Sequence, residues 1–187
     1  WLGSIGGGVL MIDTKQSPFT FYSLNLAEDD VPTTAVRALF ADADKDLWLG
    51  TGSYGLARKD YETGVLSFFS HIPEFSDIPS VPTVNYIIQR KNGEVWFATY
   101  DGGILIYEKG EKVKVLTESD TPYLYSDCVS ALCEDSKGNC WVGCRGGMGI
   151  SLADGGHYRF GTLSFAGGGL ADWYHVKDNA EIGRAHV

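Results

Sequence analysis

The amino-acid sequence predicts an all-β fold, and two observations lead to this prediction. Tryptophans recur at spacings of 47, 48 and 45 residues, at Trp1, Trp48, Trp96 and Trp141. Each repeat holds four short segments rich in Val, Ile, Leu and aromatic residues, separated by Gly, Asp, Asn and Ser, with no sustained helical period. Four antiparallel strands repeated at this length are the signature of a β-propeller. We therefore expect a β-propeller fragment of about four four-stranded antiparallel blades in an incomplete ring.

The first two strands of each blade carry the strongest pattern. The segments 36–48, 84–96 and 129–141 each place a valine 12 residues before the tryptophan. Between the two apolar runs of each segment lies a turn, in which Asn92 or Asp135 can accept hydrogen bonds from local backbone amides. Gly93 and Gly138 can take the positive φ that closes such a turn. In the segment 36–48, we expect Asp46 to replace this turn glycine.

The third and fourth strands follow each tryptophan. The third strands begin at Gly8, Gly55 and Gly103, and the fourth show alternating apolar residues at Phe19 and Phe21, Leu66 and Phe68, Val113 and Val115, and Tyr158 and Phe160. Since one sheet cannot bury both of its faces, each tryptophan is expected to pack between neighbouring blades. The small residue two places after it would leave room where the inner strands crowd.

These segments divide the chain into units. Residues 1–35 form a partial blade, complete blades start near residues 36, 84 and 129, and a further blade starts near residue 172. The chain begins within a repeat, so we expect the N-terminus to be a cut edge. Residues 181–187, EIGRAHV, fit no part of the repeat, and one reading of their codons matches a sequencing adapter. We therefore expect the propeller to end at Ala180 and the tail to be non-native.

Composition excludes some partners. The 187 residues carry a formal net charge of −9, and their acids are scattered along the chain. Nucleic acids and anionic membranes require clustered Lys and Arg, so neither is an expected partner. No apolar run reaches the roughly 18 residues of a membrane span.

The repeats resemble the two-component regulator propeller repeat. The resemblance lies in VRALFADADKDLWLGTGSYGLARKD, VNYIIQRKNGEVWFATYDGGILIYE and VSALCEDSKGNCWVGCRGGMGI, and it extends to about Ala180. The chain departs from the pattern at Arg90, which replaces the usual acid, at Cys144, which replaces Thr, and at Met148, which adds a residue. The resemblance implies the periplasmic sensor region of an inner-membrane hybrid histidine kinase that senses oligosaccharides and acts as a homodimer. It also fits a diguanylate cyclase as the output domain.

The four cysteines suggest three arrangements. Cys128, Cys133, Cys140 and Cys144 have irregular spacing, which disfavours a metal site, and we expect none. Cys133 and Cys140 align with apolar residues of the sister blades, so buried free thiols are the first expectation. Because the hairpin would place these two opposite each other, an oxidising compartment could join them in a disulfide.

The candidate ligand-binding residues are Tyr54, Tyr100 and Arg145, which stand in the loop after the second strand of each blade. Aromatic faces stack on sugar rings, and Arg donates forked hydrogen bonds to carboxylates or hydroxyls. The alternative is that all three are exposed loop or rim residues. We expect no catalytic residue and no cofactor, because Asp42 and Asp135 suit turn closure better than acid catalysis and the four histidines share no spacing.

The predicted function is therefore a non-catalytic, ligand-sensing propeller module of a membrane-bound two-component sensor. Its partners would be an oligosaccharide or other small molecule and the remaining blades and domains of its parent chain. Two alternatives stay open: part of a propeller polysaccharide lyase or glycosidase, and a propeller that binds other proteins.

Overall fold

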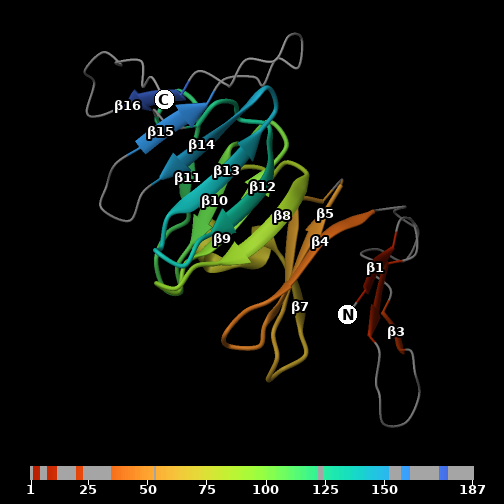
Figure 1. Cartoon of the computed structure of the whole chain (residues 1–187). Helices are drawn as coiled ribbons and strands as arrows, with labels where there is room; N and C mark the ends of the chain where they lie inside the picture. Colours follow the sequence, from red (N-terminus) through yellow and green to blue (C-terminus); the bar gives the residue numbers. More distant parts are fainter. Residues whose placement is uncertain are drawn as a thin grey trace.

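The chain folds into four antiparallel sheets in a computed structural model that describes residues 2–4, 8–11, 20–22, 35–52, 54–121, 124–151, 157–160 and 173–176 (Figure 1). The expected non-native tail, residues 181–187, lies outside the described residues. The described regular structure consists of strands and two short 3-10 helices, so the all-β prediction is confirmed.

The strands follow the repeat. The first sheet contains β1 (Leu2–Ser4), β2 (Gly8–Met11) and β3 (Thr20–Tyr22). The second contains β4 (Val36–Ala41), β5 (Leu47–Thr51), β6 (Leu56–Lys59) and β7 (Leu66–Phe68). The third contains β8 (Val84–Gln89), β9 (Val95–Thr99), β10 (Ile104–Tyr107) and β11 (Lys114–Leu116). The fourth contains β12 (Val129–Glu134), β13 (Cys140–Cys144), β14 (Gly147–Ser151), β15 (His157–Phe160) and β16 (Trp173–Val176).

Each sheet is an antiparallel meander in chain order, and the hairpin registers repeat between sheets. Trp48 pairs with Phe40, Trp96 with Ile88, and Trp141 with Cys133. In the fourth sheet, β16 pairs with β15 as a fifth strand. The expected start of a further blade near residue 172 stays a prediction, as do the other unit boundaries.

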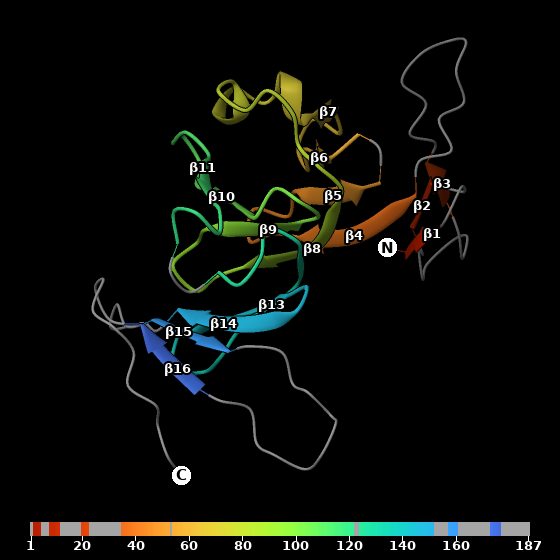
Figure 2. The same cartoon turned by 90° about the horizontal axis from the view of Figure 1, so that it is seen from above.

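The second, third and fourth sheets are stacked one below another in the view of Figure 2. Trp48 and Trp96 pack between them. Trp48 is fully buried, with its ring centroid 5.1 Å from that of Phe97 and 4.9 Å from that of Tyr107, both in the third sheet. Trp96 is buried in a second cluster, which includes Leu132 and Val142 of the fourth sheet. These contacts are the inter-blade packing that the sequence predicts.

The small residue after the tryptophan also has its expected role. A Cβ added to Gly50 would lie 2.8 Å from Cγ1 of Val84, which begins the inner strand of the next sheet. A Cβ on Gly143 would meet Ala131 at 3.5 Å, which is ordinary contact. The crowding therefore arises between sheets, where one inner strand approaches the next.

In the turns between the first two strands of each sheet, the residue at the glycine position differs from the prediction in one case. Their positive-φ position is occupied by Gly93 (97°), Gly138 (86°) and Lys45 (71°). Lys45, not Asp46, therefore replaces the turn glycine. The predicted acceptor role of the aspartates is present, since Asp135 Oδ1 accepts hydrogen bonds from the backbone N–H groups of Lys137 and Asn139, both at 2.9 Å.

The cysteine prediction is wrong in two respects: Cys133 is not buried, and it does not lie opposite Cys140. Cys140 is fully buried, but it pairs with Glu134, while Cys133 pairs with Trp141 and is exposed. Neighbouring register positions point to opposite faces of a sheet, so the two thiols do not face each other, and both are free. Phe40 at the same register packs against the following sheet, whereas Cys133 is exposed.

Candidate functional site

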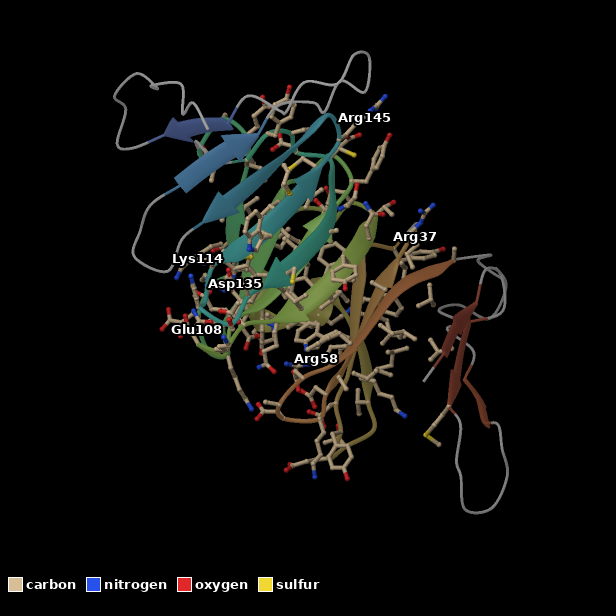
Figure 3. The ribbon with its side chains drawn as sticks, viewed as in Figure 1. Arg37, Arg58, Glu108, Lys114, Asp135 and Arg145 are labelled. Carbon is tan, nitrogen blue, oxygen red and sulfur yellow. The ribbon has the colours of Figure 1, made fainter. Side chains whose placement is uncertain are left out.

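The two ends of the sheets carry different structures. At one end, which we call the turn end, lie the turns at residues 42–46, 90–94 and 135–139. At the other, the loop end, lie the loops at residues 52–55, 100–103 and 145–146. Figure 3 shows Arg37 and Arg145 toward the loop end, with Glu108 and Asp135 at the turn end.

The three predicted ligand-binding residues all lie at the loop end. The backbone N–H groups of Tyr100 and Arg145 each donate to the carbonyl of the residue before the inner strand of the same sheet, Thr83 and Cys128, both at 2.8 Å. Gly52 makes the same bond to Ala35 at 2.9 Å. Tyr100 and Arg145 therefore occupy equivalent positions, and Tyr54 lies two residues further along its own loop.

Tyr54 contributes to a pocket of about 480 Å³, which we call the rim pocket. Its wall also contains residues from the end of β7, from the 3-10 helix η1 (Phe69–His71) and from the connection that follows. The lining residues are Tyr54, Phe68, Phe69, Ser70, His71, Ser80 and Val81. This volume falls within the usual range for small-molecule sites.

The rim pocket exists because residues 69–83, here called the strap, fold back against the loop of Tyr54. Gly55 has φ of 64°, and a Cβ there would lie 2.4 Å from the carbonyl oxygen of Val81, so only glycine allows this approach. Thr83 Oγ1 donates to the carbonyl of Gly52 at 2.7 Å. The strap and the loop are thus in direct contact along one side of the pocket.

The strap also contacts the third sheet. A Cβ on Gly102 would lie 2.7 Å from Cγ of Pro82, and Tyr100 bonds to Thr83. Residues 81–83 therefore lie between the loops of Tyr54 and Tyr100, which brings these two predicted residues to the two sides of one segment. Arg145 belongs to the next sheet and does not line the pocket.

The middle of the strap is anchored in the core. It includes the 3-10 helix η2 (Pro73–Phe75), whose Phe75 is buried and stacks on Tyr107 at 6.2 Å. Glu74 Oε1 accepts hydrogen bonds from the hydroxyl of Tyr107 at 3.4 Å and the N–H of Gly110 at 3.3 Å. Burial, followed by the Glu74 charge, raises the pKa of Tyr107 to about 12, so this hydroxyl remains a donor.

The rim pocket combines aromatic surface with a few polar groups. Tyr54 is 39% exposed and its ring meets that of Phe68 edge-on at 6.3 Å, so an aromatic surface faces the pocket. Ser70 and His71, joined at 3.2 Å between Oγ and Nδ1, supply hydroxyl and imidazole groups beside it. Aromatic surface with a few polar groups is the usual composition of a small-molecule site.

Sequence reasoning missed most of this pocket. The one signal is the connection from Phe68 to Val84, which is longer than that from Leu116 to Val129 and contains three prolines. Arg37 lies at the same end of the second sheet, outside the pocket lining. A β-bulge between Val36 and Ala38 lies at this residue, and its Nε is 3.5 Å from the position a Cβ on Gly52 would take. The same bulge recurs in β8 and β12.

Two features are absent from the described residues. No group of three or more His, Cys, Asp or Glu side chains there is arranged to hold a metal ion. None of those residues belongs to a helix long and apolar enough to cross a bilayer.

Solved structures share this fold. The extracellular domain of BT4673 from B. thetaiotaomicron, assigned to a one component system, aligns with a TM-score of 0.63 and 17% identity over 95% of this chain and 28% of its own. The extracellular domain of BT3049, assigned to a hybrid two component system of the same organism, aligns with a TM-score of 0.58 and 17% identity. This alignment covers 90% of this chain and 26% of the BT3049 domain. The chain thus spans about a quarter of the length of these structures. No curated protein matches it.

Residues 30–53 and 126–146 match the family model described as two component regulator propeller. These stretches cover the hairpin of the second sheet and that of the fourth, which are two of the three segments that carry the resemblance in the sequence. Register, inter-sheet tryptophans and structural relatives agree with this match. The chain therefore has the fold of a β-propeller, and two of its stretches match the two-component regulator propeller repeat.

Proposed function

We propose that this chain is the ligand-sensing part of an extracytoplasmic sensor, that its ligand is an oligosaccharide, and that the rim pocket binds it. The observation that carries the proposal is the rim pocket itself, where Tyr54 and Phe68 present aromatic surface beside Ser70 and His71. The repeats and the structural relatives, which are extracellular domains of signalling systems, support the sensor role.

In this proposal a sugar ring stacks against Tyr54, and its hydroxyl groups bond to Ser70, His71 and Ser80. Tyr100, 46% exposed on the other side of the strap, contacts a neighbouring sugar unit. Arg145 at the equivalent loop of the fourth sheet extends the same surface toward a longer chain. The chain itself carries out no reaction.

The signal would leave the propeller as a population shift. Ligand binding favours one arrangement of a dimeric parent protein, and this change in equilibrium reaches a histidine kinase across the inner membrane. The propeller therefore lies in the periplasm, with no cofactor and no nucleic acid as partner. A ligand can shift this equilibrium only by its difference in affinity for the two arrangements.

The proposal is tested by titrating the chain with neutral oligosaccharides of defined composition and measuring heat of binding. Tyr54→Ala should weaken binding at least tenfold, because it removes the aromatic face on which the sugar ring stacks; stacking of a nucleic-acid base on one aromatic ring is worth roughly 1–3 kcal/mol. Tyr86→Ala is the matched control, because Tyr86 is 45% exposed on β8 and does not line the pocket. Equal losses in both variants, or binding that Tyr54→Ala leaves unchanged, would contradict the rim-pocket site.

Incubating the chain with the oligosaccharide and analysing what is recovered distinguishes a sensor from an enzyme. A sensor returns the oligosaccharide intact, whereas a lyase or glycosidase returns shorter chains that chromatography resolves. A propeller that only binds proteins gives no heat with any glycan. Either of these outcomes would replace the proposal.

A further inference from the structure

Three polar side chains of the rim pocket come from the strap. Ser70 and His71 lie near its beginning, and Ser80 lies near its end. Residues 72–79 do not line the pocket, but they connect these two groups of lining residues. The positions of His71 and Ser80, the polar lining residues nearest to this middle segment, therefore depend on how the segment is held.

The middle of the strap is held in part by apolar packing. Ile72 and Phe75 are buried, and both belong to the core cluster that contains Tyr107 and Val113. The ring of Phe75 stacks on that of Tyr107 with an angle of 16° between the ring planes. Because hydrophobic attraction has no direction, this packing keeps the segment against the third sheet without fixing its orientation.

Glu74 supplies the directional contacts of the segment. Its carboxylate is half-buried, and Oε1 accepts hydrogen bonds from the hydroxyl of Tyr107 at 3.4 Å and the N–H of Gly110 at 3.3 Å. Its backbone carbonyl accepts the N–H of Val113 at 3.0 Å. A single residue of the strap is therefore bonded both to β10 and to the connection between β10 and β11.

Arg58 sets the direction of the Tyr107 hydroxyl. Its Nη1 donates to the hydroxyl oxygen at 3.1 Å. Because a guanidinium can only donate, the hydroxyl directs its own proton elsewhere, and the Glu74 carboxylate is the acceptor within reach. Arg58 itself lies 3.8 Å from Asp46 and 5.5 Å from the ring centroid of Trp48. The bond between Tyr107 and Glu74 thus joins the strap to side chains of the second and third sheets.

We propose that Glu74 is a positioning residue of the rim pocket, whose bond to Tyr107 holds His71 and Ser80 where they can bond to a ligand. Glu74 does not line the pocket and does not touch the ligand. Without its carboxylate, the segment stays packed through Phe75 but takes several orientations, and only the fraction in the original orientation binds. Apparent affinity falls in proportion to that fraction. The effect on affinity rests on the function proposed above, whereas the effect on the strap does not.

Amide hydrogen exchange of the full chain without ligand tests the effect on the strap. The N–H groups of Ile72, Phe75 and Ile78 are bonded within 3-10 turns that are too short to be stable alone. The N–H of Val113 is bonded to the Glu74 carbonyl, which the substitution retains. Glu74→Ala should speed exchange at these four amides at least tenfold and leave β9 unchanged. Unchanged exchange in the strap, or equally faster exchange in β9, would overturn the proposal.

Three further variants separate the hydrogen bond from general stability. Tyr107→Phe keeps the buried ring but removes the hydroxyl, so it should also speed exchange in the strap. If both groups act through one bond, the double variant exchanges no faster than Glu74→Ala alone. Glu74→Gln retains an acceptor oxygen and should stay within threefold of the wild type.

Lys112→Ala is the matched control on the same segment. Lys112 contacts Ser76 and Asp77 of the strap, but its side chain is 58% exposed, and exposed pairs of this kind contribute little. This variant should exchange as the wild type does. Additive effects of Glu74→Ala and Tyr107→Phe, or an effect of Lys112→Ala as large as that of Glu74→Ala, would contradict the positioning role.

Calorimetric titration with neutral oligosaccharides then tests the effect on the pocket. Glu74→Ala and Tyr107→Phe should each weaken binding about tenfold, while Glu74→Gln and Lys112→Ala should stay within threefold of the wild type. Unchanged affinity in Glu74→Ala would contradict the proposal. If the wild-type chain binds no neutral oligosaccharide, the function proposed for the rim pocket fails, and the exchange rates alone decide whether Glu74 holds the strap.

Discussion

Trp96 donates its indole N–H to Glu94 Oε2 at 2.9 Å, two residues before it in the chain. In the second sheet, Trp48 instead donates to Asp42, six residues before it, at 2.8 Å. Arg90 occupies the corresponding place in the third sheet, with its guanidinium 4.8 Å from the Trp96 ring, 3.8 Å from Glu94 and 3.4 Å from Glu134 of the fourth sheet. The indole acceptor in the third sheet therefore lies two residues before the tryptophan instead of six. Arg90, at the position that Asp42 has in the second sheet, links the third sheet to the fourth.

Glu94→Ala should lower the free energy of unfolding by about 1–3 kcal/mol, because it removes the acceptor of a part-buried indole and a partner of Arg90. Chemical denaturation followed by tryptophan fluorescence measures this. Glu108→Ala, an exposed glutamate at the same end, should change stability by less than about 0.5 kcal/mol. Equal effects of the two substitutions would show that the indole bond is unimportant.

Gly50→Ala should be destabilising by about 1–3 kcal/mol, because the added methyl group would lie 2.8 Å from Val84 of the next sheet and force the inner strands apart. Gly143→Ala is the matched control at the same position of the fourth sheet, where the methyl group meets Ala131 at ordinary distance. Thermal melting of the two variants compares them. A Gly50→Ala protein as stable as Gly143→Ala would be inconsistent with tight contact between these sheets.

Lys45→Gly should raise the free energy of unfolding by about 0.5–1 kcal/mol, since relief of left-handed strain outweighs the added freedom of the unfolded chain. Lys137 occupies ordinary backbone in the equivalent turn, so Lys137→Gly should lower stability by about 0.5–1 kcal/mol. The midpoints of urea unfolding should therefore shift upward for Lys45→Gly and downward for Lys137→Gly. Destabilisation by both substitutions would remove the case for strain at Lys45.

Acid should destabilise the turn of the fourth sheet. The side-chain amide of Asn139, together with backbone N–H groups and the Trp141 indole, lowers the pKa of Asp135 to about 2. A depressed carboxyl pKa favours folding above the unfolded value near 4, and this stabilisation is lost as pH falls from about 4 to about 2. Melting temperatures of the wild type and Asp135→Asn should therefore converge over this interval. A constant difference from pH 7 to pH 2 would contradict the assignment.

The thiols of one hairpin should differ in reactivity. Cys133 is exposed, whereas Cys140 is fully buried, and burial raises its pKa to about 12, so little thiolate forms there. In native protein, a maleimide should label Cys133 rapidly and Cys140 only after unfolding, as peptide mass spectrometry can map. Cys133→Ser should remove the rapid label. Early labelling of Cys140 would mean that the register of this hairpin is different.

The sequence was sufficient to predict the hairpins, because turn chemistry and the tryptophan spacing act locally. It was insufficient for features that depend on neighbouring sheets. Cys133 aligns with buried residues of its sister blades, but whether it is buried depends on what covers that face. Lys45, three residues before Trp48, takes the positive φ of its turn, whereas the prediction named Asp46. The strap has no counterpart in the repeat, and so most of the rim pocket was missed.

The strap is fastened to the second sheet through Gly55 and Thr83 and to the third through Glu74, Phe75 and Pro82. The width of the rim pocket therefore depends on the angle between the second and third sheets. A molecule that widens the pocket would change this angle, so binding in the pocket and the orientation of the two sheets are coupled.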